Sequence, residues 1–146
     1  MDPPAVLTIT AIEKPAPKDS EVLVAVKAAT VNRTDCAMLR AKPFIMRLLT
    51  GLFKPKNPVL GTDFAGIIEM VGKDVLSFKP GDKVFGFNDQ GLSSHAQYLV
   101  LPVNKNILTI PESVTYKQAA ASSEGAHYAY NMIKKAKLTP RAKSSC

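Results

Sequence analysis

The sequence predicts a mainly β fold of the α+β type, and two apolar runs with the turn between them carry this prediction. Residues 64–71 and 83–87 are rich in β-branched and aromatic side chains, which are enriched in strands. The tetrapeptide KPGD at residues 79–82 has the form of a type II turn, because proline presets φ at its second position and glycine accepts a positive φ at its third. Gly66, inside the first run, predicts a bulge or the close approach of another backbone.

The other strands follow from alternating apolar residues. Residues 6–12 (VLTITAI) predict a half-buried strand, and residues 21–31 predict the next one along the chain. Two more strands are expected within residues 91–102 and 103–111. In the first of these, His95 is expected at an ordinary surface position.

Three segments predict helices, which makes the fold a sheet with a few flanking helices. Residues 32–40 predict a short helix that Asn32 or Thr34 could cap. Residues 43–53 have helical apolar spacing and predict either a docked helix or a mobile flap over a hydrophobic substrate. Residues 112–138 predict one helix or a pair, with a break at Gly125.

The composition indicates one globular domain. The chain has 146 residues, of which 46% are hydrophobic and 21% are charged, and it contains no apolar run of about 18 residues that would predict a membrane span. The first residues lack the pattern of a signal peptide. Cys36 and Cys146 alone make neither a disulfide framework nor a metal cluster, so a cytoplasmic protein is the simplest interpretation.

The net charge of +7 raises the question of a nucleic-acid partner. The lysines, however, are scattered along the chain instead of being grouped with aromatic residues, and the densest basic stretch is residues 134–143. We therefore expect no nucleic-acid partner and no membrane partner.

The spacing of three motifs, VNRTD, LGTDFAGIIEMVG and GDKVFG, resembles that of the medium-chain dehydrogenase/reductase superfamily. Within it, the chain is similar to zinc-free, quinone-oxidoreductase-like, NAD(P)H-dependent alcohol dehydrogenases. The resemblance implies a GroES-like catalytic domain, a partly open β-barrel, over residues 1–138, with residues 139–146 as a disordered tail. In such proteins a Rossmann domain that binds NADPH or NADH follows this domain.

The resemblance also implies roles for the VNRTD motif. Zinc-dependent relatives have a cysteine, a basic residue, a hydroxyl residue and an aspartate where this chain has Asn32, Arg33, Thr34 and Asp35. It implies that Thr34 is a proton donor or relay, that Asn32 contacts the carbonyl group or the nicotinamide ribose, and that Arg33 contacts the cofactor phosphate. Asp35 is expected to support the site.

Further site residues are implied in two other segments. Thr62 and Asp63 stand where zinc relatives have histidine and glutamate, and we expect them, with Asp35, to have a supporting role. The third zinc-ligand position corresponds to Glu124, which we expect near the cofactor together with His127. Asn32, Thr62 and Glu124 are a poor ligand set for zinc, so the sequence predicts that no metal is used.

No glycine-rich dinucleotide-binding turn follows residue 138. Relatives read P-G-Q-K-V-L-V near this place, and one inserted nucleotide would turn such codons into the RAKSSC of residues 141–146. The sequence thus predicts a frameshift, with the Rossmann domain encoded in the neighbouring frame and no cofactor bound tightly to this chain.

Two functions remain open at this point. The first is the substrate-side domain of an NAD(P)H-dependent reductase of small hydrophobic quinones, enones or carbonyl compounds, inactive alone and prone to self-association through an exposed interdomain face. The second is a non-catalytic GroES-like module for binding or assembly.

Overall fold

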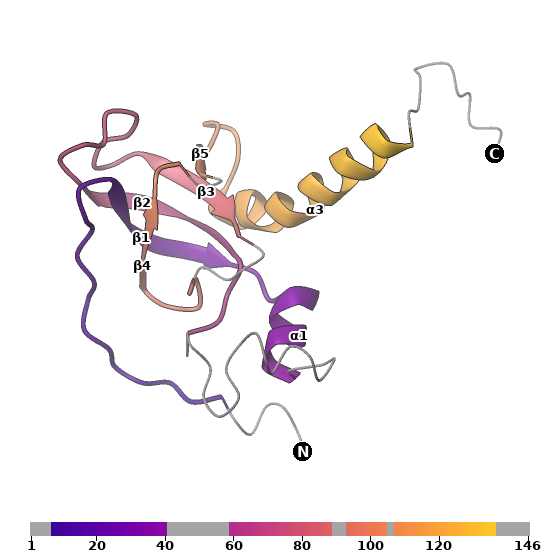
Figure 1. The fold of residues 1–146 in the computed structure, drawn as a ribbon, viewed down its shortest axis with the longest axis horizontal. Helices are drawn as coiled ribbons and strands as arrows, with labels where there is room; N and C mark the ends of the chain where they lie inside the picture. The colour runs from indigo at the N-terminus through magenta and orange to yellow at the C-terminus, as the bar shows by residue number, and fades with distance from the viewer. Residues whose placement is uncertain (1–6, 41–58, 89–92, 105–106, 137–146) are drawn as a thin grey trace.

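The computed structural model describes residues 7–40, 59–88, 93–104 and 107–136. The elements along the chain are β1 (Glu21–Ala29), α1 (Arg33–Arg40), β2 (Asp63–Val71), β3 (Lys83–Phe87), β4 (Tyr98–Pro102), β5 (Ile107–Thr109) and α3 (Tyr116–Lys135). The strands form one antiparallel sheet in the order β4-β1-β2-β3-β5 (Figure 1). The sheet is not closed. The prediction of a mainly β domain with a few helices is confirmed.

The sheet is built around β1, which pairs with β2 on one side and β4 on the other. Val22, Leu23 and Val24 of β1 are all fully buried, so both faces of this strand are covered at its start. The main core packs against one face and consists of the buried residues Val22, Val24, Phe64, Ile68, Val75, Val84, Leu99, Leu101 and Ile107. A smaller cluster joins α3 to the other face through Ala65, Ile110, Ala119 and Ala120.

Glycines shape the β unit as the sequence predicts. A Cβ on Gly66 would lie 2.4 Å from the carbonyl oxygen of Ala25 on the neighbouring strand, and the β1–β2 register shifts between Val26 and Ala28. In the turn before β3, Gly81 has a φ of 94°, and the amide of Asp82 donates to the carbonyl of Lys79 at 3.2 Å. The close approach of backbones, the bulge and the turn are therefore confirmed.

The strand predicted at residues 6–12 is wrong for its described part, residues 7–12. These residues have no partner in a sheet ladder among the described residues, and Leu7, Ile9 and Ile12 are exposed. Proline residues at positions 15 and 17 interrupt the approach to β1, and each removes a backbone donor that a ladder needs. The segment is held by Lys14, which forms an ion pair with Glu69. The Lys14 Nζ atom also lies 4.1 Å from the centre of the Tyr98 ring. The hydrogen bond to Glu69 raises the pKa of Lys14.

The two helices begin at capping residues. Asn32 caps α1, as one of the two alternatives predicted. Thr115 caps α3 and forms a capping box with Gln118. The break predicted at Gly125 is wrong, because α3 runs through this position without interruption. A helix tolerates an interior glycine at a cost of only about 1 kcal/mol relative to alanine.

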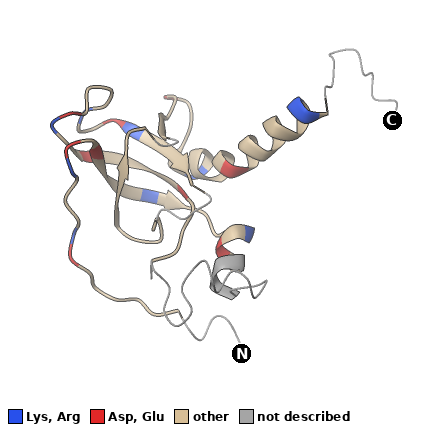
Figure 2. Cartoon of the chain, in the orientation of Figure 1, with Lys and Arg blue, Asp and Glu red and all other residues tan. Residues whose placement is uncertain are grey.

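The first turns of α3 are the ones packed against the sheet. Ala119, Ala120 and Ser123 are its buried residues, and beyond them the helix extends away from the sheet (Figure 1). Basic and acidic residues are interspersed along the described chain and do not gather at one end (Figure 2). Within the described ranges, neither helix has the length and apolar character that a membrane crossing requires. The predicted helix at residues 43–53 and the predicted tail at 139–146 lie outside the described residues.

Candidate functional site

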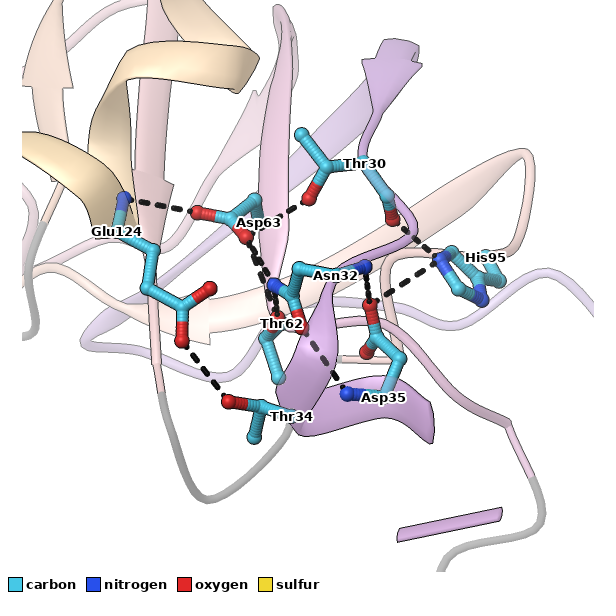
Figure 3. Close-up of polar contacts among 8 residues, drawn as sticks. All are labelled: Thr30, Asn32, Thr34, Asp35, Thr62, Asp63, His95 and Glu124. Carbon is cyan, nitrogen blue, oxygen red and sulfur yellow. Dashed lines mark hydrogen bonds and ion pairs between the residues drawn. The ribbon is translucent and has the colours of Figure 1, made fainter. Parts of the chain in front are cut away.

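A cluster of polar side chains lies where β1 ends, α1 begins, β2 begins and α3 passes over the sheet (Figure 3). Four segments that are distant in the sequence contribute to it. The cluster consists of Thr30, Asn32, Thr34, Asp35, Thr62, Asp63, His95 and Glu124.

Asp63, the first residue of β2, is the acceptor at the centre of this cluster. Its side chain is 1% exposed, and its Oδ2 accepts hydrogen bonds from Thr30 Oγ1 at 2.8 Å, Asn32 Nδ2 at 2.6 Å and Thr62 Oγ1 at 3.2 Å. Its Oδ1 accepts from the backbone amide of Glu124 at 3.2 Å. A buried carboxylate is stable only when donors surround it, and here four donors do so, from the connection between β1 and α1, the residue before β2, and α3. Asp63 therefore ties β1, α1 and α3 together.

Asn32 connects this centre to the start of α1. Its Oδ1 accepts from the Asp35 amide at 3.0 Å, while the Asp35 carboxylate accepts from the Asn32 amide at 3.0 Å, which is the reciprocal arrangement of a capping box. The Nδ2 of Asn32 donates to both Thr62 Oγ1 and Asp63 Oδ2, each at 2.6 Å. An amide nitrogen has two protons, so both are used within the protein.

His95 does not lie on a strand, contrary to the sequence prediction. It precedes β4, and its Nε2 lies 2.7 Å from the carbonyl oxygen of Thr30 and 4.0 Å from Asp35 Oδ2. The residue is exposed, as the sequence predicts, but its side chain is 27% exposed and its ring nitrogen contacts the cluster. The local alternation around His95 gives no sign of this contact, because the partner is a backbone carbonyl directly after β1, 65 residues away in the sequence.

Thr34 and Glu124 form a hydrogen-bonded pair at one side of the cluster. Thr34 Oγ1 donates to Glu124 Oε1 at 2.8 Å, and both side chains are half-buried (Figure 3). Thr34 lies in the first turn of α1, and Glu124 lies on α3 one residue after the last buried position of that helix. Both side chains therefore combine a polar oxygen atom with partial access from outside.

Two of the predicted site residues lie outside the cluster. Arg33 is the first residue of α1 and is exposed, without an ion pair among the described residues. His127 faces a mainly apolar cavity of about 510 Å³ between α3, β3 and β5. Its ring centre lies 5.0 Å from that of Phe87, and its Nε2 lies 2.8 Å from Asn131 Nδ2.

The residues at the three zinc-ligand positions are held in this cluster by hydrogen bonds. Asn32 donates directly to Thr62, and Glu124 joins them through its backbone bond to Asp63. Among the described residues, no group of three or more histidine, cysteine, aspartate or glutamate side chains is placed to hold a metal ion. The absence of zinc stays a prediction that rests on the chemistry of the amide and hydroxyl groups.

The open antiparallel sheet with few helices is that of a GroES-like domain, and comparison with known families gives the same class. Residues 18–112 match the model of the alcohol dehydrogenase GroES-like domain. The chain belongs to this family, and within it to the quinone-oxidoreductase-like part of the medium-chain dehydrogenase/reductase superfamily.

Individual proteins support this assignment. The quinone oxidoreductase of Sus scrofa is 38% identical over 107 residues, which cover 73% of this chain and 30% of that protein. The structure of the quinone oxidoreductase from Coxiella burnetii matches with a TM-score of 0.80 at 27% identity, over 94% of this chain and 43% of that one. The Escherichia coli quinone oxidoreductase, solved with NADPH, has the same fold with a TM-score of 0.68 at 24% identity, over 91% of this chain and 38% of that one. The chain spans about 30% of the length of the curated relatives it matches.

Proposed function

We propose that this chain is the substrate-side domain of a zinc-independent, NAD(P)H-dependent oxidoreductase. The reaction would move a hydride between a nicotinamide cofactor and a small hydrophobic quinone, enone or carbonyl compound. The observation that carries the proposal is the hydrogen-bonded pair of Thr34 and Glu124, held by the Asp63 network in a domain of the quinone-oxidoreductase-like family.

The role proposed for Thr34 follows from the hydrogen-bonding capacity of its neighbours. Asn32 has both amide protons bound within the protein, and the hydroxyl of Thr62 is buried and bound to Asp63. Thr34 is half-buried, and its hydroxyl, which donates to Glu124 Oε1 in this structure, would turn its proton toward a bound substrate oxygen. Without a metal to polarise the substrate oxygen, hydroxyl and amide groups of this kind stabilise the developing charge.

A nicotinamide dinucleotide fits some of the predicted cofactor residues better than others. Arg33 fits best, because it is exposed at the first position of α1, where the helix N-terminus also attracts anions, and would hold a phosphate. His127 fits as a contact for an aromatic ring, since it already lies against Phe87 at the cavity. Asn32 and Glu124 would act through the network that holds them. When bound, the cofactor supplies or accepts the hydride.

The test is to join this chain to a dinucleotide-binding domain, through the neighbouring reading frame of its gene or as a fusion, and to assay NADPH oxidation. A panel of quinones and enones is the substrate set, and Thr34→Val is the variant. We expect turnover by the joined protein. Thr34→Val should lower kcat by a larger factor than it changes KM, because the hydroxyl acts mainly in the transition state. Absence of turnover with the whole panel would contradict the proposal.

A second candidate, a non-catalytic binding or assembly module, is favoured by one observation. The outer half of α3 carries exposed Tyr128, Tyr130, Met132 and Ile133. Exposed apolar residues in such numbers on one helix are typical of an interface. We infer that the isolated chain self-associates through this half of α3 and that it acts in the cytoplasm. Sedimentation over a range of concentrations tests the association, with Met132→Lys as the variant expected to weaken it.

A further inference from the structure

β5 is one of the two edge strands of the sheet and pairs only with β3 (Figure 1). The amide of Ile110, the residue after β5, donates to the carbonyl of Lys83 at 2.8 Å. In an antiparallel ladder, the backbone groups of every second residue face the partner strand. Because Ile110 faces β3 in this way, Leu108 does so as well. The N–H and C=O groups of Ile107 and Thr109 therefore point away from the sheet.

These four outward groups have no hydrogen-bond partner among the described residues. A row of unpaired backbone groups at a sheet edge is a template for pairing with another strand. The other edge strand, β4, is less suited to this. It ends in Pro102, which has no N–H to donate, and the Lys14 side chain lies over the ring of its first residue, Tyr98. β5 is therefore the edge that is open to pairing.

The side chains of β5 leave apolar surface uncovered next to this edge. Leu108 is 64% exposed and lines the cavity of about 510 Å³ between α3, β3 and β5. On the α3 side the same cavity is lined by the small residues Ser122 and Ala126. A large exposed apolar side chain beside an apolar cavity is typical of a surface that another element covers. The backbone and the side chains of β5 thus indicate the same missing neighbour.

A second copy of β5 satisfies this edge completely. With a two-fold axis at Leu108, Ile107 of each copy lies opposite Thr109 of the other copy, and all of the outward backbone groups pair. A shift of the register by two residues would place Ile107 opposite Pro111, which has no N–H. Residues 106–111 (NILTIP) contain no charged side chain, so this part of the strand brings no like charges together across the axis.

We propose that β5 is a dimer interface, in which two copies of this chain join edge to edge by antiparallel pairing about a two-fold axis at Leu108. The two five-stranded sheets then form one continuous sheet. The two Leu108 side chains meet at a position where the Cα atoms of facing residues lie only about 4.5 Å apart. The inference goes beyond the proposed function, since it needs neither cofactor nor substrate, and it uses a different surface from the outer half of α3.

The first experiment follows association and amide exchange in the 146-residue chain carrying Met132→Lys, which weakens association through α3. Sedimentation should show a monomer at low concentration and a dimer, without larger species, at high concentration. Between roughly 10 µM and roughly 1 mM protein, hydrogen exchange should slow at least about tenfold at the amides of Ile107 and Thr109. The amide of Leu108, which faces β3, should be protected at both concentrations.

The second experiment tests the two-fold axis by reversing charge at one position. Leu108→Lys and Leu108→Glu, made in the same Met132→Lys chain, should each weaken the dimer at least about tenfold, because like charges then face each other. An equal mixture of the two variants should associate again, since opposite charges meet across the axis. Leu108 is exposed, so both variants should keep the circular dichroism spectrum of the folded chain. The matched controls, Leu76→Lys and Leu76→Glu, change an exposed leucine outside β5 and should leave association unchanged, alone or mixed.

Four results would each overturn the inference. They are a chain with Met132→Lys that stays monomeric at roughly 1 mM, growth into assemblies larger than a dimer, a dimer that Leu108→Lys leaves intact, and a mixture that associates no better than its components. The first of these results would assign any association of the original chain to α3. A joined protein that lacks oxidoreductase activity would contradict the proposed function alone, whereas these measurements concern the edge of β5 alone.

Discussion

Asp63 has the most hydrogen bonds of any single side chain in the candidate site. Three of its four donors are side chains, two in the connection between β1 and α1 and one directly before β2, and the fourth is the backbone of α3. All four point at oxygen atoms of a carboxylate that is 1% exposed. A neutral amide of the same shape could not accept from all of them.

We expect Asp63→Asn to destabilise the chain by about 2–3 kcal/mol, because its NH₂ group must face at least one of the groups that donate to the carboxylate. If the amide nitrogen takes the Oδ2 position it faces Asn32 Nδ2, and if it takes the Oδ1 position it faces the Glu124 amide. Chemical denaturation measures the change. The control is Asp74→Asn, the same substitution at an exposed residue, which should change stability by less than about 0.5 kcal/mol. Equal effects at the two positions would contradict the prediction.

At the scale of single residues, the sequence predicts which side chains lie close together, but it does not predict the hydrogen bonds between them. Asn32, Thr34, Asp35, Thr62, Asp63 and Glu124 are all brought together, as the motif resemblance implies. The resemblance could not predict that both amide protons of Asn32 are bound within the protein, since that depends on distances across three segments. Thr30 and His95 were missed because their contact depends on the path of the chain before β4 and on a backbone carbonyl, which no residue pattern marks.

At the scale of elements, two glycines have opposite surroundings and give opposite predictions. Gly66 lies in the interior of β2, opposite the bulge of β1, where a Cβ would come within 2.4 Å of Ala25 O and 2.7 Å of Val24 Cγ1. The first of these atoms belongs to a backbone fixed on both sides by β2 and β4. Gly125 lies in α3, where a Cβ would meet no atom within 4 Å among the described residues.

We expect Gly66→Ala to destabilise the chain by about 1–3 kcal/mol, since extra volume in a packed interior forces shifts of the backbone. Thermal unfolding followed by circular dichroism measures this. The same substitution at exposed Gly81 is not a suitable control, because its φ of 94° strains any other residue. An unchanged melting temperature for Gly66→Ala would mean that β1 and β2 can separate locally at no cost.

Gly125→Ala should have the opposite sign and stabilise α3 by about 0.5–1 kcal/mol. Alanine loses less conformational entropy than glycine on entering a helix, and here the new methyl group has open space. The helical signal in circular dichroism should rise together with the unfolding midpoint. A loss of helix in this variant would indicate that the bend predicted from the sequence does form in solution.

Errors in predicting the elements have one physical origin. The alternation in residues 7–12 and the glycine at position 125 are local signals. The tertiary surroundings outweigh both, since residues 7–12 form no strand and α3 continues through Gly125. An alternating segment becomes a strand only where a neighbouring edge offers hydrogen bonds, and a single glycine ends a helix only where the following residues prefer another conformation. Residues 64–71, by contrast, were predicted correctly because apolar content, β-branched residues and flanking turns all agree there.

The molecule as a whole is a packed sheet with an exposed helix leading away from it. Most of the buried residues lie in the sheet, in the segments next to it and in the first turns of α3, while the described residues of α3 from Gly125 onward are exposed or half-buried. The chain also spans only about 30% of the length of its curated relatives. Both facts bear on how tightly this chain by itself can bind a dinucleotide cofactor.

The last prediction is that the 146-residue chain alone binds NADPH with a dissociation constant of 1 mM or weaker and does not oxidise it. The sequence contains no glycine-rich dinucleotide-binding turn, and Arg33 is the exposed cation best placed among the predicted cofactor residues. One charge-assisted hydrogen bond contributes roughly 1.5–3 kcal/mol. A dissociation constant of 1 mM already requires about 4 kcal/mol. A nicotinamide held this loosely is not positioned for hydride transfer.

Titration of the chain with NADPH, followed by nuclear magnetic resonance, measures this affinity, and Arg33→Gln should abolish what remains of it. The matched control is Lys73→Gln, which removes an exposed cation paired with Asp19 far along the chain from α1 and should leave the titration unchanged. Micromolar binding, or oxidation of NADPH with a quinone by this chain alone, would mean that the described domain holds a nucleotide site of its own, and Arg33 would then be only one contact among several.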